Sequence, residues 1–166
     1  MLRPEGGPRE DFTLTDQYGE PYRLADQRGK IVLLFFGYAH CPDVCPVTLS
    51  NWARVEEALA AETDVEFVFV TVDPERDTVE RLREHLEIFS DRFRGLTGTE
   101  EQVTPVYENF GIFHEKVSIS GSVMGYVVDH TTVMLLLDRE GRVRLTFPFD
   151  ADPDEIVHDV KRLLAS

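Results

Sequence analysis

Two cysteines carry the clearest potential for chemistry in this sequence. Cys41 and Cys45 are the only cysteines among its 166 residues, and both lie within the stretch GYAHCPDVCP, residues 37–46. On a helix, the Cys-x-x-x-Cys spacing sets the two sulfurs about one turn apart, close enough to form a disulfide or to share a metal ion. Two thiolates alone make an incomplete metal site, so a metal would need a third ligand from elsewhere in the chain.

The residues around the cysteines predict a strand that turns into a helix. Residues 31–36 (IVLLFF) form a continuous β-branched and aromatic run, typical of a strand buried at the centre of a mainly parallel sheet. A helix is expected over 46–62, beginning near Pro46, because apolar residues recur there at helical spacing (Val47, Leu49, Trp52, Val55 and Leu59). Such a turn is a usual place for a site, and the N-terminus of a helix favours a negatively charged thiolate.

Two simpler readings of the cysteines stand beside a metal site. They could merely pack in the core, but buried structural cysteines are seldom paired at a strand-to-helix turn beside proline. They could form a plain dithiol oxidoreductase, although the spacing differs from the Cys-x-x-Cys of thioredoxins. That difference weakens the second reading without excluding it.

The stretch around the cysteines resembles the signature of the Sco/SenC copper-binding proteins. The resemblance continues, in the expected order, over most of the chain from about Phe12 to the last strand, in the motifs VDPERDT (72–78), GLTG (95–98) and VDHTT (128–132). It implies a thioredoxin-like metallochaperone that takes part in the assembly of cytochrome c oxidase. One departure is Ala39, where family members often have threonine, but this is not a ligand position.

The resemblance also implies a ligand set. In the family, the two cysteines and the histidine of the Val-Asp-His motif bind copper, and these correspond to Cys41, Cys45 and His130. Two thiolates and one imidazole suit copper, because sulfur favours Cu(I) and the added nitrogen allows Cu(II) to be held as well. Zinc is the main rival metal for a Cys₂His set with an open fourth position.

Other polar residues near these motifs are candidates for supporting roles. Asp73, Asp129 and His40 could orient the ligands, with capping or loop roles as their alternatives. Met124 offers a thioether but is expected to be a mobile apolar residue, in a Ser/Gly loop over 118–125.

The remaining histidines are expected to be structural or exposed. His85 and His158 lie on predicted helices among charged residues and should be at the surface. His114 lies on a presumed strand and is expected to be structural.

Length and composition predict a single domain over 1–166 with a flexible lead-in at 1–10. A hydrophobic content of 42% supports a sizeable core. The formal net charge of −14 argues against binding of nucleic acid or of anionic lipid surfaces. It favours docking to a basic partner face, with a generally acidic solvated surface as the plainer alternative.

The longest apolar run falls far short of the roughly 20 residues that a membrane helix needs. Sco/SenC proteins are usually tethered by an N-terminal anchor and face the periplasm or the mitochondrial intermembrane space. We therefore expect Met1 to begin a portion cut from an anchored parent, located on the outer face of the cytoplasmic membrane, in the periplasm, or in the intermembrane space of a eukaryote.

The rest of the chain predicts an α/β, thioredoxin-like fold: a central mainly parallel sheet flanked by helices, with an extra N-terminal β-hairpin over 11–24. Asp77 and Thr78 are expected to cap a helix, and Thr99 with Gln102 to form a capping box that opens another, with Gly111 just past its end. Further strands are expected over 65–72, 93–98, 112–117, 133–138 and 143–147, and a closing helix over 152–164.

These expectations combine into a copper metallochaperone that is not an enzyme in the usual sense. As a monomer, it would bind one copper through Cys41, Cys45 and His130 and deliver it to the binuclear copper site of cytochrome c oxidase, through the copper-bearing subunit or its assembly factors. The alternative is a thiol–disulfide reductase in which Cys41 and Cys45 reduce the target's cysteines. A peroxiredoxin-like peroxidase is disfavoured, because Tyr38 stands where a threonine or serine hydroxyl would be needed.

Overall fold

The computed structural model describes residues 11–39, 44–118 and 126–165, and for residues 44, 45, 118, 126, 127 and 129 it describes the backbone alone. The elements in chain order are β1 (Thr13–Thr15), β2 (Pro21–Arg23), the 3-10 helix η1 (Leu24–Gln27), β3 (Ile31–Gly37), α1 (Val44–Ala58), β4 (Val65–Thr71), α2 (Val79–Glu87), β5 (Arg94–Leu96), α3 (Glu100–Phe110), β6 (His114–Ser118), β7 (Tyr126–His130), β8 (Val133–Leu137), β9 (Val143–Pro148) and α4 (Pro153–Leu164). Within these residues, no helix is both long and apolar enough to cross a lipid bilayer.

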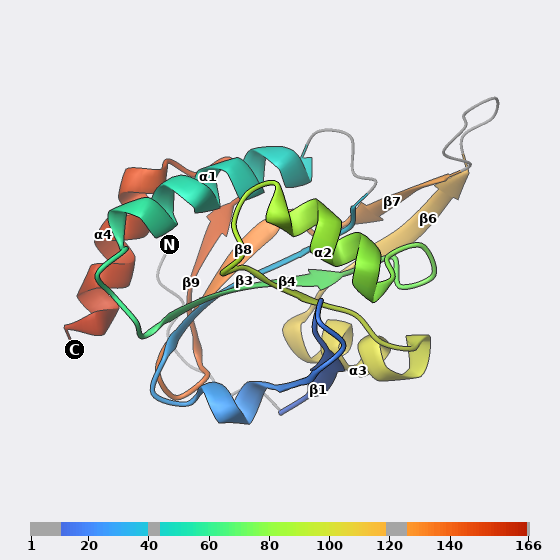
Figure 1. Ribbon diagram of the computed structural model, residues 1–166, viewed down its shortest axis with the longest axis horizontal. Coiled ribbons are helices and arrows are strands. Elements are labelled where there is room, and N and C mark those ends of the chain that lie inside the picture. Colours follow the sequence, from blue (N-terminus) through green and yellow to red (C-terminus); the bar gives the residue numbers. More distant parts are fainter. Residues whose placement is uncertain (1–10, 40–43, 119–125, 166) are drawn as a thin grey trace.

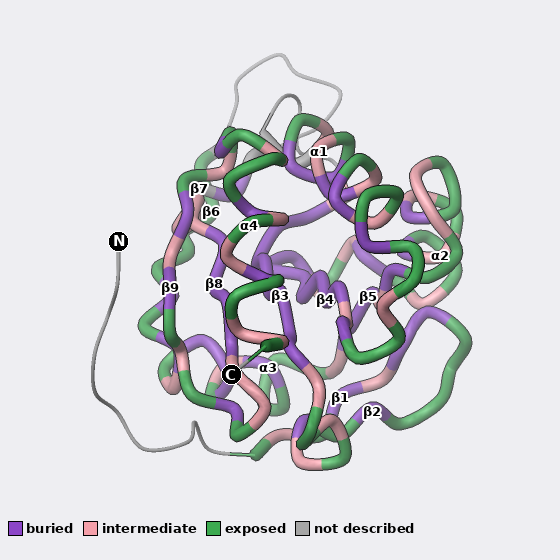
Figure 2. The backbone as a smooth tube through the Cα atoms, turned by 90° about the vertical axis from the view of Figure 1, so that its left-hand side faces the viewer, coloured by how far each residue is buried: buried purple, intermediate pink, exposed green. Residues whose placement is uncertain are grey.

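The central sheet has five strands in the order β5-β4-β3-β8-β9 (Figure 1). The strand β3 pairs in parallel with β4, and β4 in parallel with β5. The strand β8 is antiparallel to both β3 and β9, so the sheet is mixed and β8 runs against its four companions. The expected central strand is confirmed, because all seven residues of β3 are buried, and Figure 2 shows the buried path running through β3, β4 and β8.

Helices cover both faces of the sheet, and neighbouring residues of β3 point to opposite layers. Phe35 packs against Trp52 of α1, whereas Phe36 packs against Tyr107 and Phe110 of α3. Helices α1, α2 and α4 lie on the first face, and α3 lies with the β1–β2 hairpin on the second (Figure 1). The hairpin is the N-terminal one that the sequence predicts, with β1 antiparallel to β2. Because side chains alternate along a strand, β3 supplies the core of both layers.

The helix that follows Cys41 begins and ends earlier than the expected range of 46–62. Helix α1 starts at Val44, so Pro46 is its third residue. Proline is tolerated there because the N–H groups of a first helical turn have no partner within the helix. The helix stops at Ala58, and Asp64 then accepts a hydrogen bond from the Ile31 N–H at 2.7 Å, which turns the chain back into the sheet.

A two-stranded ribbon of β6 and β7 projects from the end of the sheet (Figure 1). The sequence predicts a strand over 112–117, which corresponds to β6, but it does not predict β7. The structure instead pairs the two strands in an antiparallel register, with His114 opposite His130, so that His130 ends β7. The loop over 119–125, with Met124, lies outside the described residues.

Most predicted helix ends are confirmed. The Thr78 hydroxyl accepts the Arg81 N–H at the start of α2, and Asp152 caps α4. Thr99 and Gln102 form both bonds of the capping box of α3, and Gly111 ends that helix at φ 68°, a left-handed conformation that glycine adopts without strain. These caps fix where each helix meets the sheet.

Candidate metal site

The site expected from the sequence lies where β3 ends and α1 begins. The chain leaves β3 through Tyr38 and Ala39, while His40 and Cys41 lie outside the described residues. Cys45 is the second residue of α1, and of this residue the structure describes the backbone alone. The backbone therefore puts Cys45 in the first turn of a helix, where the exposed N–H groups favour a thiolate.

His130 is distant from β3 in the sequence but lies at the same end of that strand in the fold. Its imidazole stands edge-on to the rings of Tyr38 and Phe35, with ring centroids 5.8 and 6.1 Å apart. The Tyr38 hydroxyl accepts the Val128 N–H at 3.1 Å, which fastens β7 to the segment that leads into the cysteines. The fold thus brings His130 beside a residue three positions before Cys41.

One hydrogen bond fixes which nitrogen of His130 can bind a metal. Its Nδ1 lies 2.9 Å from the carbonyl oxygen of Thr131. A carbonyl can only accept, so Nδ1 carries the proton and Nε2 of the neutral ring keeps its lone pair. A backbone carbonyl on one ring nitrogen is the usual way in which proteins orient a histidine for a metal on the other.

Asp73 is linked through Arg76 to Tyr38, which belongs to the cysteine segment, residues 37–46. It is fully buried just after β4, and its carboxylate pairs with the Arg76 guanidinium. The guanidinium carbon of Arg76 in turn lies 5.9 Å from the ring centroid of Tyr38, within the range of a cation–π contact. Asp73 can therefore influence the site through Arg76 and Tyr38. The side chain of Asp129 is not among those described.

Asp77 has a role other than the one expected. The sequence offers Asp77 and Thr78 as caps of α2, but Thr78 alone provides the cap. The buried Asp77 carboxylate turns the other way, and its Oδ2 accepts the Ala39 N–H at 3.0 Å and the Thr71 hydroxyl at 2.7 Å. A helix needs only one N-cap residue, and the sequence offers two adjacent ones. This surplus was the signal that Asp77 or Thr78 makes a different contact.

The environment of Asp77 changes its protonation. Burial raises the pKa of this carboxyl to about 6, against the lowering effect of the hydrogen bonds from Thr71 and Ala39. The negative charge of Asp73 raises this pKa further, while the positive charge of Arg81 lowers it. A carboxyl group that titrates near neutrality thus lies next to the cysteine segment.

Of the other described histidines, His158 and His114 fit their predictions and His85 does not. His158 is exposed on α4, as expected. The prediction for His85 is wrong, because its ring is half-buried against Phe69 and Phe89, with centroids 6.3 and 6.1 Å apart. His114 packs its ring on Tyr107 at 4.5 Å, which fits a structural role.

Two further features bear on what the site can hold. Among the described side chains, which exclude both cysteines, there is no group of three or more His, Cys, Asp or Glu that could hold a metal ion. A cavity of about 180 Å³ opens between Ala39 and helix α2, lined by Ala39, Arg81, Glu84, His85 and Ile88. Ala39, two residues before Cys41 in the chain, therefore borders a hollow on the side of α2.

The arrangement of sheet, helices and strand-to-helix cysteine turn defines a protein of the thioredoxin-like class, and solved Sco structures share it. The SCO1/SenC family model matches residues 4–165, so the chain belongs to the SCO1/SenC family.

Individual relatives agree with this assignment. An SCO2-like protein of Rickettsia felis is 36% identical over 152 residues, which are 91% of this chain and 74% of the relative. The mitochondrial protein SCO2 homolog of Mus musculus is 36% identical over 168 residues, 99% of this chain and 66% of the relative. The structure of Bradyrhizobium japonicum ScoI with copper bound has a TM-score of 0.87 and 36% identity, over 95% of this chain and 100% of that one.

Proposed function

We propose that this protein binds one copper ion through Cys41, Cys45 and His130 and delivers it to the binuclear copper site of cytochrome c oxidase. The observation that carries the proposal is the position of His130, edge-on to Tyr38 with Nδ1 bonded to the Thr131 carbonyl. The structure of Bradyrhizobium japonicum ScoI, a similar protein, has copper bound and supports copper as the metal. The assembly of cytochrome c oxidase is the role that the resemblance to Sco/SenC proteins implies.

The chemistry of the three donors suits a carrier. Two thiolates bind Cu(I) well, and the imidazole adds the nitrogen donor that Cu(II) prefers. The Nε2 atom of His130 is the free donor, and Cys45 would offer its sulfur from the first turn of α1. Three donors leave room for ligands of a target protein, so copper can pass to it by stepwise exchange of one ligand at a time.

The relatives support a proposal for the location of the protein. The Mus musculus relative is a mitochondrial protein, and Sco/SenC proteins are usually anchored to a membrane. We therefore place this protein in the mitochondrial intermembrane space or, in a bacterium, at the outer face of the cytoplasmic membrane. Its partner there would be the copper-bearing subunit of the oxidase or an assembly factor of that subunit.

Anaerobic copper titration of the reduced protein, followed by absorption and electron paramagnetic resonance spectra, tests the ligand set. His130→Ala should lose Cu(II) binding and weaken Cu(I) binding, because a pair of thiolates holds Cu(II) poorly. Cys41→Ser and Cys45→Ser should each lose both. His158→Ala is the matched control, since its exposed ring lies on α4. Unchanged Cu(II) affinity and spectrum in His130→Ala would remove His130 from the ligand set.

A thiol–disulfide reductase is the second candidate, because the paired thiols and the helix N-terminus at Cys45 also suit that chemistry. The same variants separate the two functions. Thiol exchange needs only the cysteines, so His130→Ala should keep measurable dithiol reactivity. A cell that carries His130→Ala should fail to assemble the oxidase if copper delivery is the function. Normal assembly would favour the reductase.

A further inference from the structure

The buried carboxylate of Asp77 joins two segments that meet at the end of the sheet. Its side chain is fully buried, and Oδ2 accepts hydrogen bonds from the Ala39 N–H and the Thr71 hydroxyl. The other oxygen, Oδ1, is also buried and has no hydrogen-bond partner among the described residues. Both bonds therefore fall on one oxygen, with Ala39 on one side and the end of β4 on the other.

The β4 side of this contact is held firmly in place. The Thr71 hydroxyl also accepts the Asp73 N–H at 2.9 Å, and the Thr71 carbonyl accepts the hydroxyl of Tyr107 from α3. The Asp77 N–H donates to the Asp73 carbonyl at 2.9 Å, which closes the loop on itself. These bonds fix the position of the Asp77 carboxylate. The carboxylate therefore determines where the Ala39 N–H lies.

The Ala39 side leads directly to the cysteines. The ladder between β3 and β4 finishes with the Val72 N–H donating to the Gly37 carbonyl at 2.8 Å. Tyr38 is then held by the Val128 N–H, and Ala39 by Asp77. Within the described part of the chain, the bond that the Ala39 N–H donates to Asp77 is the last hydrogen bond of the backbone before Cys41.

We propose that Asp77 is a positioning residue for the two cysteines: its carboxylate holds the Ala39 N–H and so sets the direction in which the chain leaves β3 toward Cys41. The inference deepens the proposed function, since it takes Cys41 and Cys45 to be the working thiols. It does not require that the metal is copper.

Local stability does not account for an aspartate at this position. Thr78 already caps α2, so Asp77 is not needed for that purpose. Burial raises the pKa of Asp77 to about 6, which means that its charged form at neutral pH lowers the stability of the fold. The charged groups that act on it are Asp73, which is paired with Arg76, and Arg81. The carboxylate accepts two hydrogen bonds in this position, and the one from Ala39 is the bond that reaches the segment before Cys41.

The equilibrium of the dithiol with glutathione tests the proposal without any metal. Glutathione disulfide oxidises Cys41 and Cys45 to a disulfide and is itself reduced to two glutathione thiols. Asp77→Ala should change this equilibrium constant by about tenfold or more, because the sulfurs meet less well when the segment is released. Asp77→Asn should stay within about threefold of wild type, because an amide oxygen can accept the same two bonds.

Thr78→Ala is the matched control, since it removes the cap of the same helix and leaves the bond to Ala39 intact. Its glutathione equilibrium should match wild type even though its stability falls. A wild-type equilibrium in Asp77→Ala overturns the proposal. So does an equal shift in Asp77→Ala and Asp77→Asn, because the carboxyl would then act through its charge and not by holding Ala39.

A second measurement covers the case in which Asp77→Ala does not fold. The amide resonance of Ala39, followed by NMR in wild type, should shift with pH around a midpoint of about 6, because its acceptor titrates there. The shift should be absent in Asp77→Asn. An Ala39 amide that ignores this titration would show that the bond is not made. Failure of wild type to bind copper would end the proposed function but leave both of these tests standing.

Discussion

Several weak contacts orient the side chain of His130, the proposed third ligand. Its ring is held edge-on by Phe35 and Tyr38, and its Nδ1 proton is directed to the Thr131 carbonyl. Each contact is modest, of about 0.5–1.5 kcal/mol. Together they remove the freedom to rotate, so a metal at Nε2 does not have to order the ring when it binds.

The two thiols should be available either to each other or to copper, but not to both at once. We expect mild oxidation to join Cys41 and Cys45 in an intramolecular disulfide, since only three residues separate them in the chain. A disulfide sulfur is a far poorer ligand than a thiolate, so the oxidised protein should lose its copper. Thiol counting and metal analysis before and after oxidation check this. Full copper retention by the oxidised form would contradict a shared site.

The burial of Asp77 predicts a pH-dependent stability. The pKa of its carboxyl is raised from 3.8 in the unfolded chain to about 6 in the fold. Between these values the native state holds a proton that the unfolded state has released, so the contribution of Asp77 to stability falls as pH rises. Asparagine lacks this effect. The free energy of unfolding of Asp77→Asn, relative to wild type, should therefore increase by about 2–3 kcal/mol between pH 4 and 7. Urea unfolding at each pH measures it, and parallel curves would contradict the shift.

At the scale of elements, α1 is anchored to the sheet by one large residue. Trp52 is fully buried, its ring contacts Phe35, Phe67 and Phe93, and its indole N–H donates to the Met134 sulfur at 3.0 Å. This helix carries Cys45 in its first turn, so the packing of Trp52 also locates the site.

Truncation of this anchor should be costly. Trp52→Ala should lower the free energy of unfolding by about 3–5 kcal/mol, through lost burial and the cavity left behind. Arg54→Ala, two residues along the same helix and exposed, should change it by less than about 0.5 kcal/mol. Circular dichroism in urea is the appropriate measurement, because Trp52 is the one tryptophan of the chain and its fluorescence disappears with it. A loss below 1 kcal/mol in Trp52→Ala would show that α1 is held in some other way.

Elements with a strong local pattern could be predicted from the sequence, whereas the pairing of β6 with β7 could not. The buried run of β3, the capping box at Thr99 and the end of α3 at Gly111 each depend on neighbours in the chain, and all are confirmed. The strand β7 follows a Ser/Gly stretch and pairs with a polar strand, β6. No alternation of apolar and polar residues therefore indicates β7 in the sequence. Its existence depends on the ribbon as a whole.

The candidate site divides in the same way. The motifs indicate Cys41, Cys45 and His130 as candidates, but periodicity cannot show that Tyr38 touches both His130 and β7. Asp77 comes directly before a predicted helix, so its position in the sequence indicates a cap. The contact with Ala39 joins residues that are distant in the chain, and only the folded sheet brings them together.

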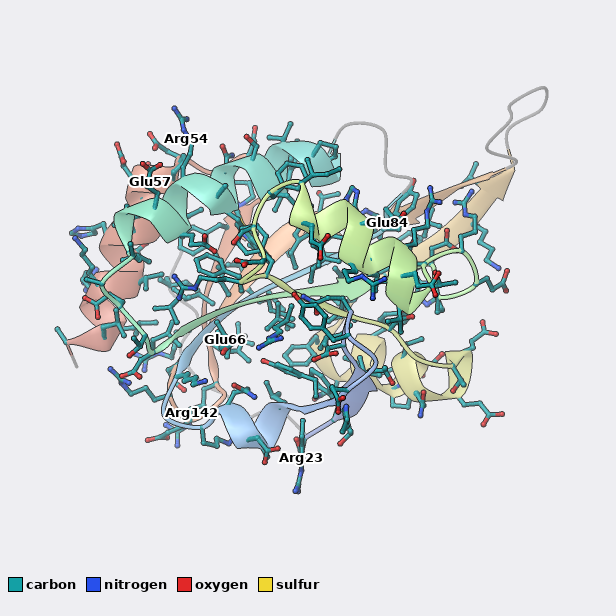
Figure 3. The ribbon with its side chains drawn as sticks, viewed as in Figure 1. Arg23, Arg54, Glu57, Glu66, Glu84 and Arg142 are labelled. Carbon is teal, nitrogen blue, oxygen red and sulfur yellow. The ribbon has the colours of Figure 1, made fainter. Side chains whose placement is uncertain are left out.

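At the scale of the whole molecule, charge is the dominant surface property. The formal net charge is −14, and Figure 3 shows charged side chains such as Arg54 and Glu57 pointing outward from α1. The hollow beside Ala39 is lined by one acidic residue, Glu84 of α2, together with Arg81. A basic face on a partner would complement this surface.

The association rate with the oxidase subunit should therefore fall with salt. Raising ionic strength from about 10 to 300 mM shortens the reach of surface charge and should slow association by about tenfold or more, with a smaller effect on dissociation. Stopped-flow mixing of the two proteins measures both rates. Glu84→Lys should reduce the salt dependence if the face beside Ala39 meets the partner. A flat salt profile would rule out electrostatic steering.

The bond between Tyr38 and Val128 has a consequence for the order of events during synthesis. The cysteine turn leaves the ribosome early, whereas β7 and β8, the neighbour of β3 in the sheet, come from the last third of the chain. A nascent chain that has reached only α3 carries its two thiols without β7, the strand that contains His130. It is a bare dithiol, open to oxidation or to any thiol-seeking metal. The proposed three-donor site would close only once β7 has emerged and docked, so copper loading through it would follow the completion of the fold.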